Sequence, residues 1–318
     1  MIKSSDDNSL IRPQTLYEAR LIGSISGTEL SVETLSQRLA DTDVVIIGEY
    51  HGHQAAHLLQ SQIQAALYRQ QPLQILSMEQ FTLDKQAAVD AYLSGETGET
   101  EMMEDSNAWD NYRGSYRPLM EFARQQSLPV IAANAPAAIV RCVGRTGPGY
   151  LDRLATHDRA SLPDHPFMDT PAYREKFEAT INSSHGAADD AMRERLDNTY
   201  KAQLLRDNTM ASRILASHSA HPSHQIVHIT GTFHSEEHLG TVAMLRQRAP
   251  DLSIAVISPV IWPEGAEMPP LDENRNKGDF LYVIQPLPEE FLDKDRERKA
   301  MSARFHRPTE DTCQGDSP

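Results

Sequence analysis

Short runs of consecutive hydrophobic residues recur along the chain and alternate with segments in which hydrophobic residues are spaced as in a helix. Four branched residues at 44–47 predict a strand that is buried on both faces. Similar runs predict strands at 73–79, 128–134, 225–230, 252–258 and 280–284. The helical spacing predicts helices at 30–39, 54–69, 84–93, 119–126, 187–218 and 236–248. This alternation predicts an α/β fold with a mostly parallel, doubly wound sheet and flanking helices.

Other parts of the chain lack a clear period and set the expected domain boundaries. Residues 1–16 form a polar lead-in, and 17–292 are predicted to form the α/β domain. Within it, about 95–220 is expected to be an inserted, mainly helical subdomain, because the flanking irregular segments are polar or rich in Gly and Pro. The segment between residues 95 and 116 is predicted to be a loop or lid. The charged tail at 293–318 is predicted to be disordered, since no hydrophobic period supports it.

Polar side chains stand where several of the predicted strands end. Glu49, Glu79, Asn134 and His234 each end or closely follow a strand, and His51 lies two residues beyond Glu49. Ligands of open α/β sheets bind beyond the carboxyl ends of the strands. We therefore expect these side chains to converge at one rim of the sheet.

Two carboxylates and two imidazoles in one place suit acid–base catalysis or a divalent metal ion. Glu49, His51, Glu79 and His234 are accordingly the candidate catalytic residues, and Glu49, His51 and His234 are also the candidate metal ligands. Each of the two histidines ends a Gly-x-x-His sequence, in which the glycine permits a sharp turn and a close approach. The alternative is structural: the glutamates cap helices, and the imidazoles are hydrogen-bonded core groups.

Six further histidines divide into three groups. His53 and His57 share one face of a predicted helix and are candidate cofactor-binding residues. The His-Glu-x-x-His pattern of zinc proteases is absent because residue 54 is Gln. The histidines at 218–224 are predicted to lie on the surface, whereas His228 is predicted to be a core residue.

Composition narrows the classes of partner. The chain has 30 basic and 45 acidic residues and a net charge of -15, which disfavours nucleic acid and anionic lipid surfaces. Its two cysteines, Cys142 and Cys313, are too few for a disulfide framework and are not spaced as zinc ligands. No hydrophobic run reaches the roughly 18 residues of a membrane span. Walker, Gly-x-Ser-x-Gly and Rossmann glycine motifs are also absent.

Six stretches, in order over about 15–260, resemble the ChaN-like haem-binding uptake proteins. These stretches are Gly48-Glu49-Tyr50-His51, residues 77–81, 109–118, 132–136 and 207–211, and Gly231-Thr232-Phe233-His234. The wider group includes the Tiki metalloproteases and the erythromycin esterases. The resemblance implies an α/β domain with a helical subdomain, in a bacterial iron-regulated lipoprotein that binds haem, with a homodimer enclosing two haems. It also implies a periplasmic or outer-membrane location, with membrane contact through an anchor that is not present in this sequence.

Two hypotheses follow, and they use different parts of the chain. The first is a haem-binding protein of iron acquisition, a binding protein rather than an enzyme. Tyrosine is the iron ligand that the resemblance implies, and Tyr150 in the glycine-rich segment is the candidate. The alternative is a metal- or His/Glu-dependent hydrolase of an ester or peptide bond. In that case His51 or His234 acts as a base or metal ligand, and Glu49 and Glu79 orient them.

Overall fold

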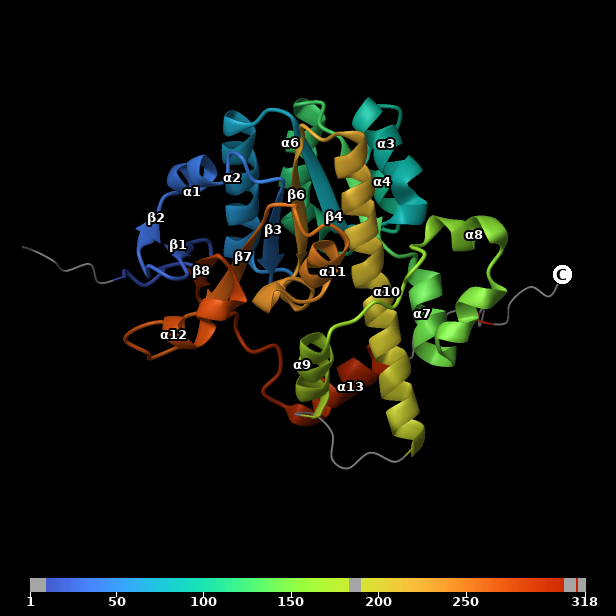
Figure 1. The fold of residues 1–318 in the computed structure, drawn as a ribbon. Helices are drawn as coiled ribbons and strands as arrows, with labels where there is room; N and C mark the ends of the chain where they lie inside the picture. Colours follow the sequence, from blue (N-terminus) through green and yellow to red (C-terminus); the bar gives the residue numbers. More distant parts are fainter. Residues whose placement is uncertain (1–9, 183–189, 306–312, 314–318) are drawn as a thin grey trace, which may run out of the picture.

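The computed structural model describes residues 10–182, 190–305 and 313, and it contains an eight-stranded sheet with helices on both faces (Figure 1). The strands are β1 Arg20–Gly23, β2 Glu29–Leu30, β3 Val44–Glu49, β4 Gln74–Thr82, β5 Val130–Asn134, β6 Gln225–Gly231, β7 Ile254–Ile261 and β8 Phe280–Ile284. Their order is β2-β1-β8-β7-β3-β6-β4-β5. Every pair from β8 to β5 is parallel, whereas β1 pairs antiparallel with both β2 and β8. The predicted fold class is confirmed.

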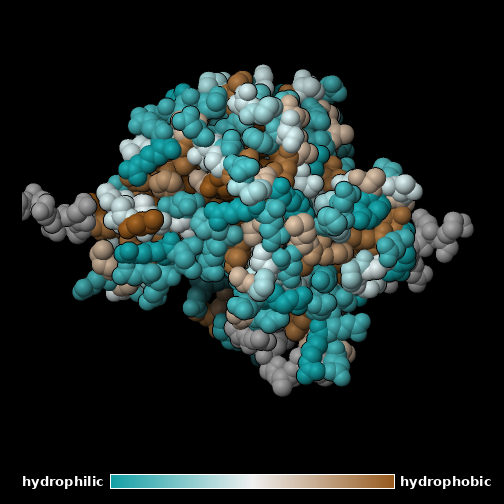
Figure 2. All heavy atoms as spheres, viewed as in Figure 1, coloured by the Kyte–Doolittle hydropathy of each residue, from teal (hydrophilic) through white to brown (hydrophobic). Residues whose placement is uncertain are grey.

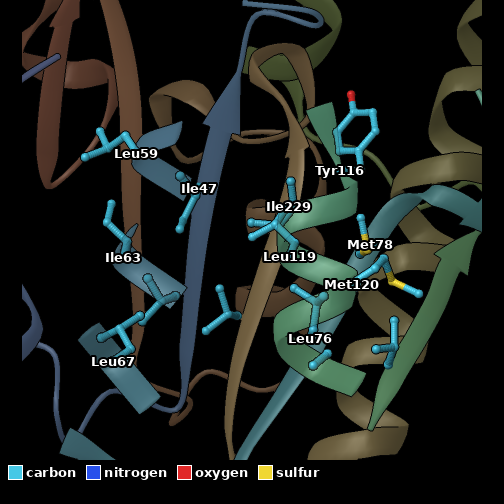
Figure 3. Packing of buried hydrophobic residues seen from close by; sticks show 14 of the residues in the cluster. Ile47, Leu59, Ile63, Leu67, Leu76, Met78, Tyr116, Leu119, Met120 and Ile229 are labelled. Atoms are coloured by element: carbon cyan, nitrogen blue, oxygen red, sulfur yellow. The ribbon is translucent and has the colours of Figure 1, made fainter. Parts of the chain in front are cut away.

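Alternate residues of the central strands supply two separate hydrophobic cores. On β3, Val45 and Ile47 belong to one core, while Val44 and Ile46 belong to the other. The first core is covered by α1 Val32–Arg38, α2 Gln54–Gln70, α3 Gln86–Ser94, α4 Glu99–Asp105, α5 Tyr112–Ser115 and α6 Arg117–Gln125, and Figure 3 shows part of it. The second core is covered by α10 Asp190–Ala220 and α11 Thr241–Arg248. A strand buried on both faces thus explains the unbroken hydrophobic run at 44–47.

The long helix α10 extends past the sheet, and its N-terminal half carries a small helical layer (Figure 1). This layer contains α7 Ala137–Thr146, the 3-10 turn η2 Pro148–Arg153, α8 Thr156–Ser161 and α9 Pro171–Asn182. Helix α7 and η2 pack on Ala202 and Leu205 of α10, while Tyr173 and Phe177 of α9 pack on Tyr200. The remaining elements are η1 Leu83–Lys85, η3 Thr232–His234, η4 Glu236–His238, α12 Leu271–Asn274, η5 Arg275–Lys277 and α13 Lys294–Phe305.

A disulfide between Cys142 of α7 and Cys313 joins the end of the chain to this layer. Both cysteines are buried in the cluster that also contains Tyr150 and Leu151. The pair spans 171 positions of sequence. This pairing was not predicted, because two cysteines so far apart in sequence do not by themselves indicate that they meet.

Two segments are more ordered than predicted. The expected loop between residues 95 and 116 contains α4 and α5, and α4 begins where the backbone N–H of Gly98 donates to the Glu101 carboxylate at 2.6 Å. The tail that was expected to be disordered contains α13, within which Lys294 pairs with Glu297 at 3.0 Å. Charged pairs of this kind support a helix without any hydrophobic period. Of the rest of the tail, only residue 313 lies within the described residues.

Two boundaries also differ from the prediction. The helix expected at 236–248 begins only at Thr241, because Glu237 and Gly240 have positive φ angles of 62° and 56°. A Cβ on Gly240 would lie 2.7 Å from the backbone oxygen of His234, so the turn requires glycine. Strand β4 continues to Thr82, three residues beyond its predicted end. Within residues 10–182 and 190–305, no helix combines the length and the apolar character that crossing a membrane requires.

Candidate functional site

Two carboxylates and two imidazoles from three adjacent strands line one pocket. Glu49 is the last residue of β3, and His51 lies in the turn that follows it. Glu79 lies in β4, one residue after its pairing with β6 ends, and His234 lies in η3 directly after β6. The pocket has a volume of about 350 Å³, and its other lining residues are Tyr50, Gln203, Arg206, Gly231, Thr232 and Phe233. The parallel order β3-β6-β4 therefore brings together groups that lie far apart in sequence.

The Glu49 carboxylate is buried and accepts hydrogen bonds on both oxygens. Oε1 accepts from His51 Nδ1 at 2.8 Å and from the Tyr116 hydroxyl at 2.6 Å. Oε2 accepts from the Gln60 amide at 2.6 Å. Figure 3 shows Tyr116 at one end of the hydrophobic core, with its hydroxyl directed away from the apolar side chains. Burial raises the pKa of Tyr116, and the charge of Glu49 raises it further, so the phenol stays protonated as a donor.

The His51 ring is the exposed member of this network. Its side chain is 45% exposed, whereas Glu49 is buried. Burial lowers the pKa of His51, but the hydrogen bond to Glu49 and the charges of Glu49 and Glu79 raise it more, so the net shift is upward. Because Nδ1 donates to Glu49, Nε2 is the ring nitrogen left for a ligand. Trp109 contacts the ring edge to face at 4.9 Å between centroids.

Gly231 allows the His51 ring to lie against the end of β6. A Cβ at this position would come within 2.9 Å of both Cε1 and Nε2 of His51. The backbone N–H of Gly231 also donates to Glu79 Oε2 at 2.7 Å. The glycine of the second Gly-x-x-His turn thus leaves the space that the histidine of the first turn occupies.

The second network places His234 between two carboxylates. His234 Nδ1 donates to Asp207 Oδ1 at 2.7 Å, and Nε2 lies 3.4 Å from Glu79 Oε1. Burial lowers the pKa of His234, but the charges of Asp207 and Glu79 outweigh it and raise the pKa to about 10. Burial likewise raises the pKa of Glu79, but the charge of His234 and hydrogen bonds hold it well below its usual range. His234 is therefore an imidazolium at neutral pH.

Asp207 of α10 is fixed in turn by hydroxyl donors. The Tyr173 hydroxyl donates to Oδ2 at 2.6 Å, and the Thr241 hydroxyl donates to Oδ1 at 2.9 Å. The Asp207 side chain is completely buried. Helices α9, α10 and α11 thus each contribute one group that orients His234.

Three candidates lie outside the pocket. His53 begins α2, and its Nε2 donates to the backbone oxygen of Gln285 at 2.8 Å. His57 lies behind Glu49, where its Nε2 accepts from the backbone N–H of Gly52 at 3.0 Å. Tyr150 lies in η2 within the α7 cluster. The structure therefore assigns His53 and His57 structural hydrogen bonds and places neither of them with Tyr150.

The predicted core position of His228 is confirmed. Its side chain is fully buried, and Nδ1 lies 2.9 Å from the Ser77 hydroxyl. Burial lowers its pKa to about 4, so the ring is neutral. Asn134 also has a structural role at the rim, since its amide donates to the backbone oxygen of Glu79 at 3.1 Å.

The predicted metal site is not found. Across residues 10–182, 190–305 and 313, no group of three or more His, Cys, Asp and Glu residues has an arrangement suited to a metal ion. The physical reason is that Glu49 and His51 belong to one hydrogen-bond network while His234 belongs to another. Both nitrogens of His234 face carboxylates.

The sheet is mostly parallel, and a half-exposed imidazole that is hydrogen-bonded to a carboxylate lies above its strand ends. This arrangement is typical of an α/β domain that binds or transforms a small ligand. The chain belongs to the family of haem-binding uptake proteins, Tiki superfamily, ChaN, whose model matches residues 35–245. No curated protein sequence matches the chain.

The structure was also compared with solved structures. ChaN of Campylobacter jejuni, described with cofacial haem binding, has a TM-score of 0.62 and 14% identity over 84% of this chain and 97% of its own. An erythromycin esterase mutant, EreC in its open conformation, has a TM-score of 0.47 and 13% identity over 90% of this chain and 87% of its own. A Bacillus cereus protein has a TM-score of 0.48 and 11% identity over 80% of this chain and 92% of its own. At these identities, the likeness to ChaN establishes the fold.

Proposed function

We propose that this protein binds haem in bacterial iron acquisition. The observation that carries the proposal is the match to the haem-binding uptake family, which covers residues 35–245 and so includes both the His/Glu pocket and Tyr150. The fold likeness to a ChaN structure with cofacial haem supports it over 84% of the chain. Haem iron accepts phenolate or imidazole as an axial ligand, and apolar walls hold the macrocycle.

The surroundings of Tyr150 fit such a ligand better than the His/Glu pocket does. The pocket of about 350 Å³ is lined largely by charged and polar groups, which do not suit a porphyrin face. Tyr150 packs instead among apolar residues that include Ile139 and Leu151, and its hydroxyl forms no hydrogen bond with the described residues. The Arg153 guanidinium lies 5.2 Å from the ring centroid, where it suits a propionate. Figure 2 shows hydrophobic residues at the surface beside α7 and α8.

Hemin titration tests this proposal directly. Wild-type protein is expected to shift and sharpen the Soret band at stoichiometric hemin, and Tyr150→Phe is expected to weaken binding about tenfold or more, because it removes only the phenolate oxygen. Tyr17→Phe is the matched control, since Tyr17 is 65% exposed and lies outside the α7 cluster. An unchanged hemin spectrum with the wild-type protein contradicts haem binding.

The family also suggests a location and an assembly. We propose a periplasmic or outer-membrane location and a homodimer. The Cys142–Cys313 disulfide supports this location, because disulfides persist in oxidising compartments and are rare in the cytosol. Sedimentation with and without hemin tests whether the protein forms the homodimer.

A second candidate function is hydrolysis of an ester or peptide bond at the His/Glu pocket. The specific observation in its favour is the half-exposed His51, whose Nδ1 is held by buried Glu49 while the rest of the ring lines the pocket. In this arrangement Glu49 fixes the tautomer, and Nε2 takes a proton from an attacking water. His234 lines the same pocket, but both of its nitrogens face carboxylates, so His51 is the imidazole available to act on a ligand.

An ester and peptide substrate screen tests this candidate. Any activity is expected to fall to background in His51→Ala, because the base is removed, and to fall strongly in Glu49→Gln, because the tautomer is no longer fixed. His157→Ala is the control, since its side chain is 88% exposed and remote from the pocket. Activity that survives His51→Ala excludes this ring as the base, and a screen without any activity contradicts this second candidate.

A further inference from the structure

One cation of the His/Glu pocket has no partner among the residues that the structure describes. Arg206 of α10 lines the pocket and is half-buried. Its guanidinium forms no hydrogen bond or ion pair with any residue in the described part of the chain. Arg213, two turns further along the same helix, instead donates to Gln86 at 3.0 Å. Because no described protein group accepts from it, this fork of donors is free to bind a ligand.

The acidic groups that line the pocket with Arg206, and its neighbour Asp207, already accept hydrogen bonds from other groups. Glu49 accepts from His51, Tyr116 and Gln60, and Glu79 accepts from Thr230, Gly231 and His234. Asp207, the next residue along the helix, accepts from His234 and two hydroxyls. The pocket therefore contains acids, but their oxygens face other donors.

The position of Arg206 on the helix directs it into the pocket. Gln203 and Arg206 lie three residues apart, so they share the helix face that lines the pocket. His51 lines the same pocket from the opposite element, the turn after β3. A ligand group bound at Arg206 thus sits in the same small volume as the exposed imidazole.

We propose that this pocket recognises its ligand through a carboxylate or phosphate that binds to Arg206. A guanidinium presents a planar fork of donors that matches these anions with two parallel hydrogen bonds. The chain carries a net charge of -15, which repels anions from most of the surface, so a local cation is needed to admit one. This inference stands independently of whether the protein binds haem or hydrolyses a bond.

The carboxylate can come from a haem propionate or from a separate small ligand, and two arms distinguish these sources. In the first arm, hemin and hemin dimethyl ester are titrated with wild-type protein and Arg206→Gln. In the second arm, propionate, methyl phosphate and the neutral propionamide are titrated, with the fluorescence of Trp109 as the signal. Trp109 contacts His51, and the only other tryptophan, Trp262, is replaced by Phe so that the signal is specific.

At least one anion is expected to bind wild-type protein, and Arg206→Gln is expected to weaken that binding by about 10- to 100-fold. Arg206→Lys keeps the charge but loses the fork, so it should retain part of the affinity and shows that the site still folds. Arg195→Gln is the matched control, with the same change of charge on an exposed part of the same helix. Propionamide should not bind.

Each outcome decides the proposal. If Arg206→Gln weakens hemin but not its dimethyl ester, the anion is a haem propionate. If it weakens propionate or methyl phosphate alone, the anion belongs to a separate ligand. If no anion binds wild-type protein, or if every anion binds Arg206→Gln and wild type equally, the proposal is wrong.

Discussion

Replacing Asp207 with alanine is expected to lower the free energy of unfolding by about 3–5 kcal/mol. The carboxylate is completely buried and holds the His234 imidazolium at 2.7 Å. Its removal leaves a buried cation whose nearest acid, Glu79, is 3.4 Å away, and it leaves the Tyr173 hydroxyl without its acceptor. An uncompensated buried charge costs far more than the loss of an exposed ion pair.

Urea unfolding at neutral pH measures this effect, and the same helix provides a control. Asp197 pairs with Arg174 at 3.3 Å, but its side chain is 50% exposed, so Asp197→Ala should cost less than about 1 kcal/mol. Asp207→Asn keeps the shape and one acceptor, and it should fall between the two. Equal losses for Asp207→Ala and Asp197→Ala would show that the His234 network does not stabilise the fold.

The sequence predicted the central sheet because its strands are buried on both faces. The run at 44–47 is hydrophobic at every position, so it can be recognised as a buried strand without knowing which strands pair with it. Strands β1 and β2 were missed because four and two residues are too short to show a period. Helix α13 was missed because exposed charge pairs, not apolar residues, line it.

The site was predictable only where topology alone decides the geometry. Glu49, Glu79 and His234 lie at or near the carboxyl ends of parallel strands, so the sheet rule places them together before any packing is known. Asp207 lies on α10, and Tyr116 lies between α5 and α6. The rotation and crossing of these helices depend on the whole core, so the sequence alone does not place these two partners. Both residues fall in stretches that resemble the family, 109–118 and 207–211, and this resemblance was the only indication of them in the sequence. The resemblance does not indicate which side chain of each stretch points into the site.

His234 also makes a specific prediction for alkaline pH. Its pKa is 6.5 when unperturbed and about 10 in the folded protein, where burial opposes but the charges of Asp207 and Glu79 dominate. A raised pKa means that the folded state holds the proton more tightly than the unfolded state. The resulting stabilisation is complete below about pH 6.5 and is lost as the pH rises through about 10, and it is on the order of 5 kcal/mol.

Unfolding free energies measured from pH 6.5 to 10 test the sign of this effect. Wild-type stability should fall steadily over that range, whereas His234→Gln should start lower and change much less, because the titrating group is gone. The difference between the two curves removes the contribution of lysines and tyrosines that titrate near pH 10. His157→Gln should follow the wild-type slope, since that ring is 88% exposed. Parallel curves for wild type and His234→Gln would show that the ring is not held as an imidazolium.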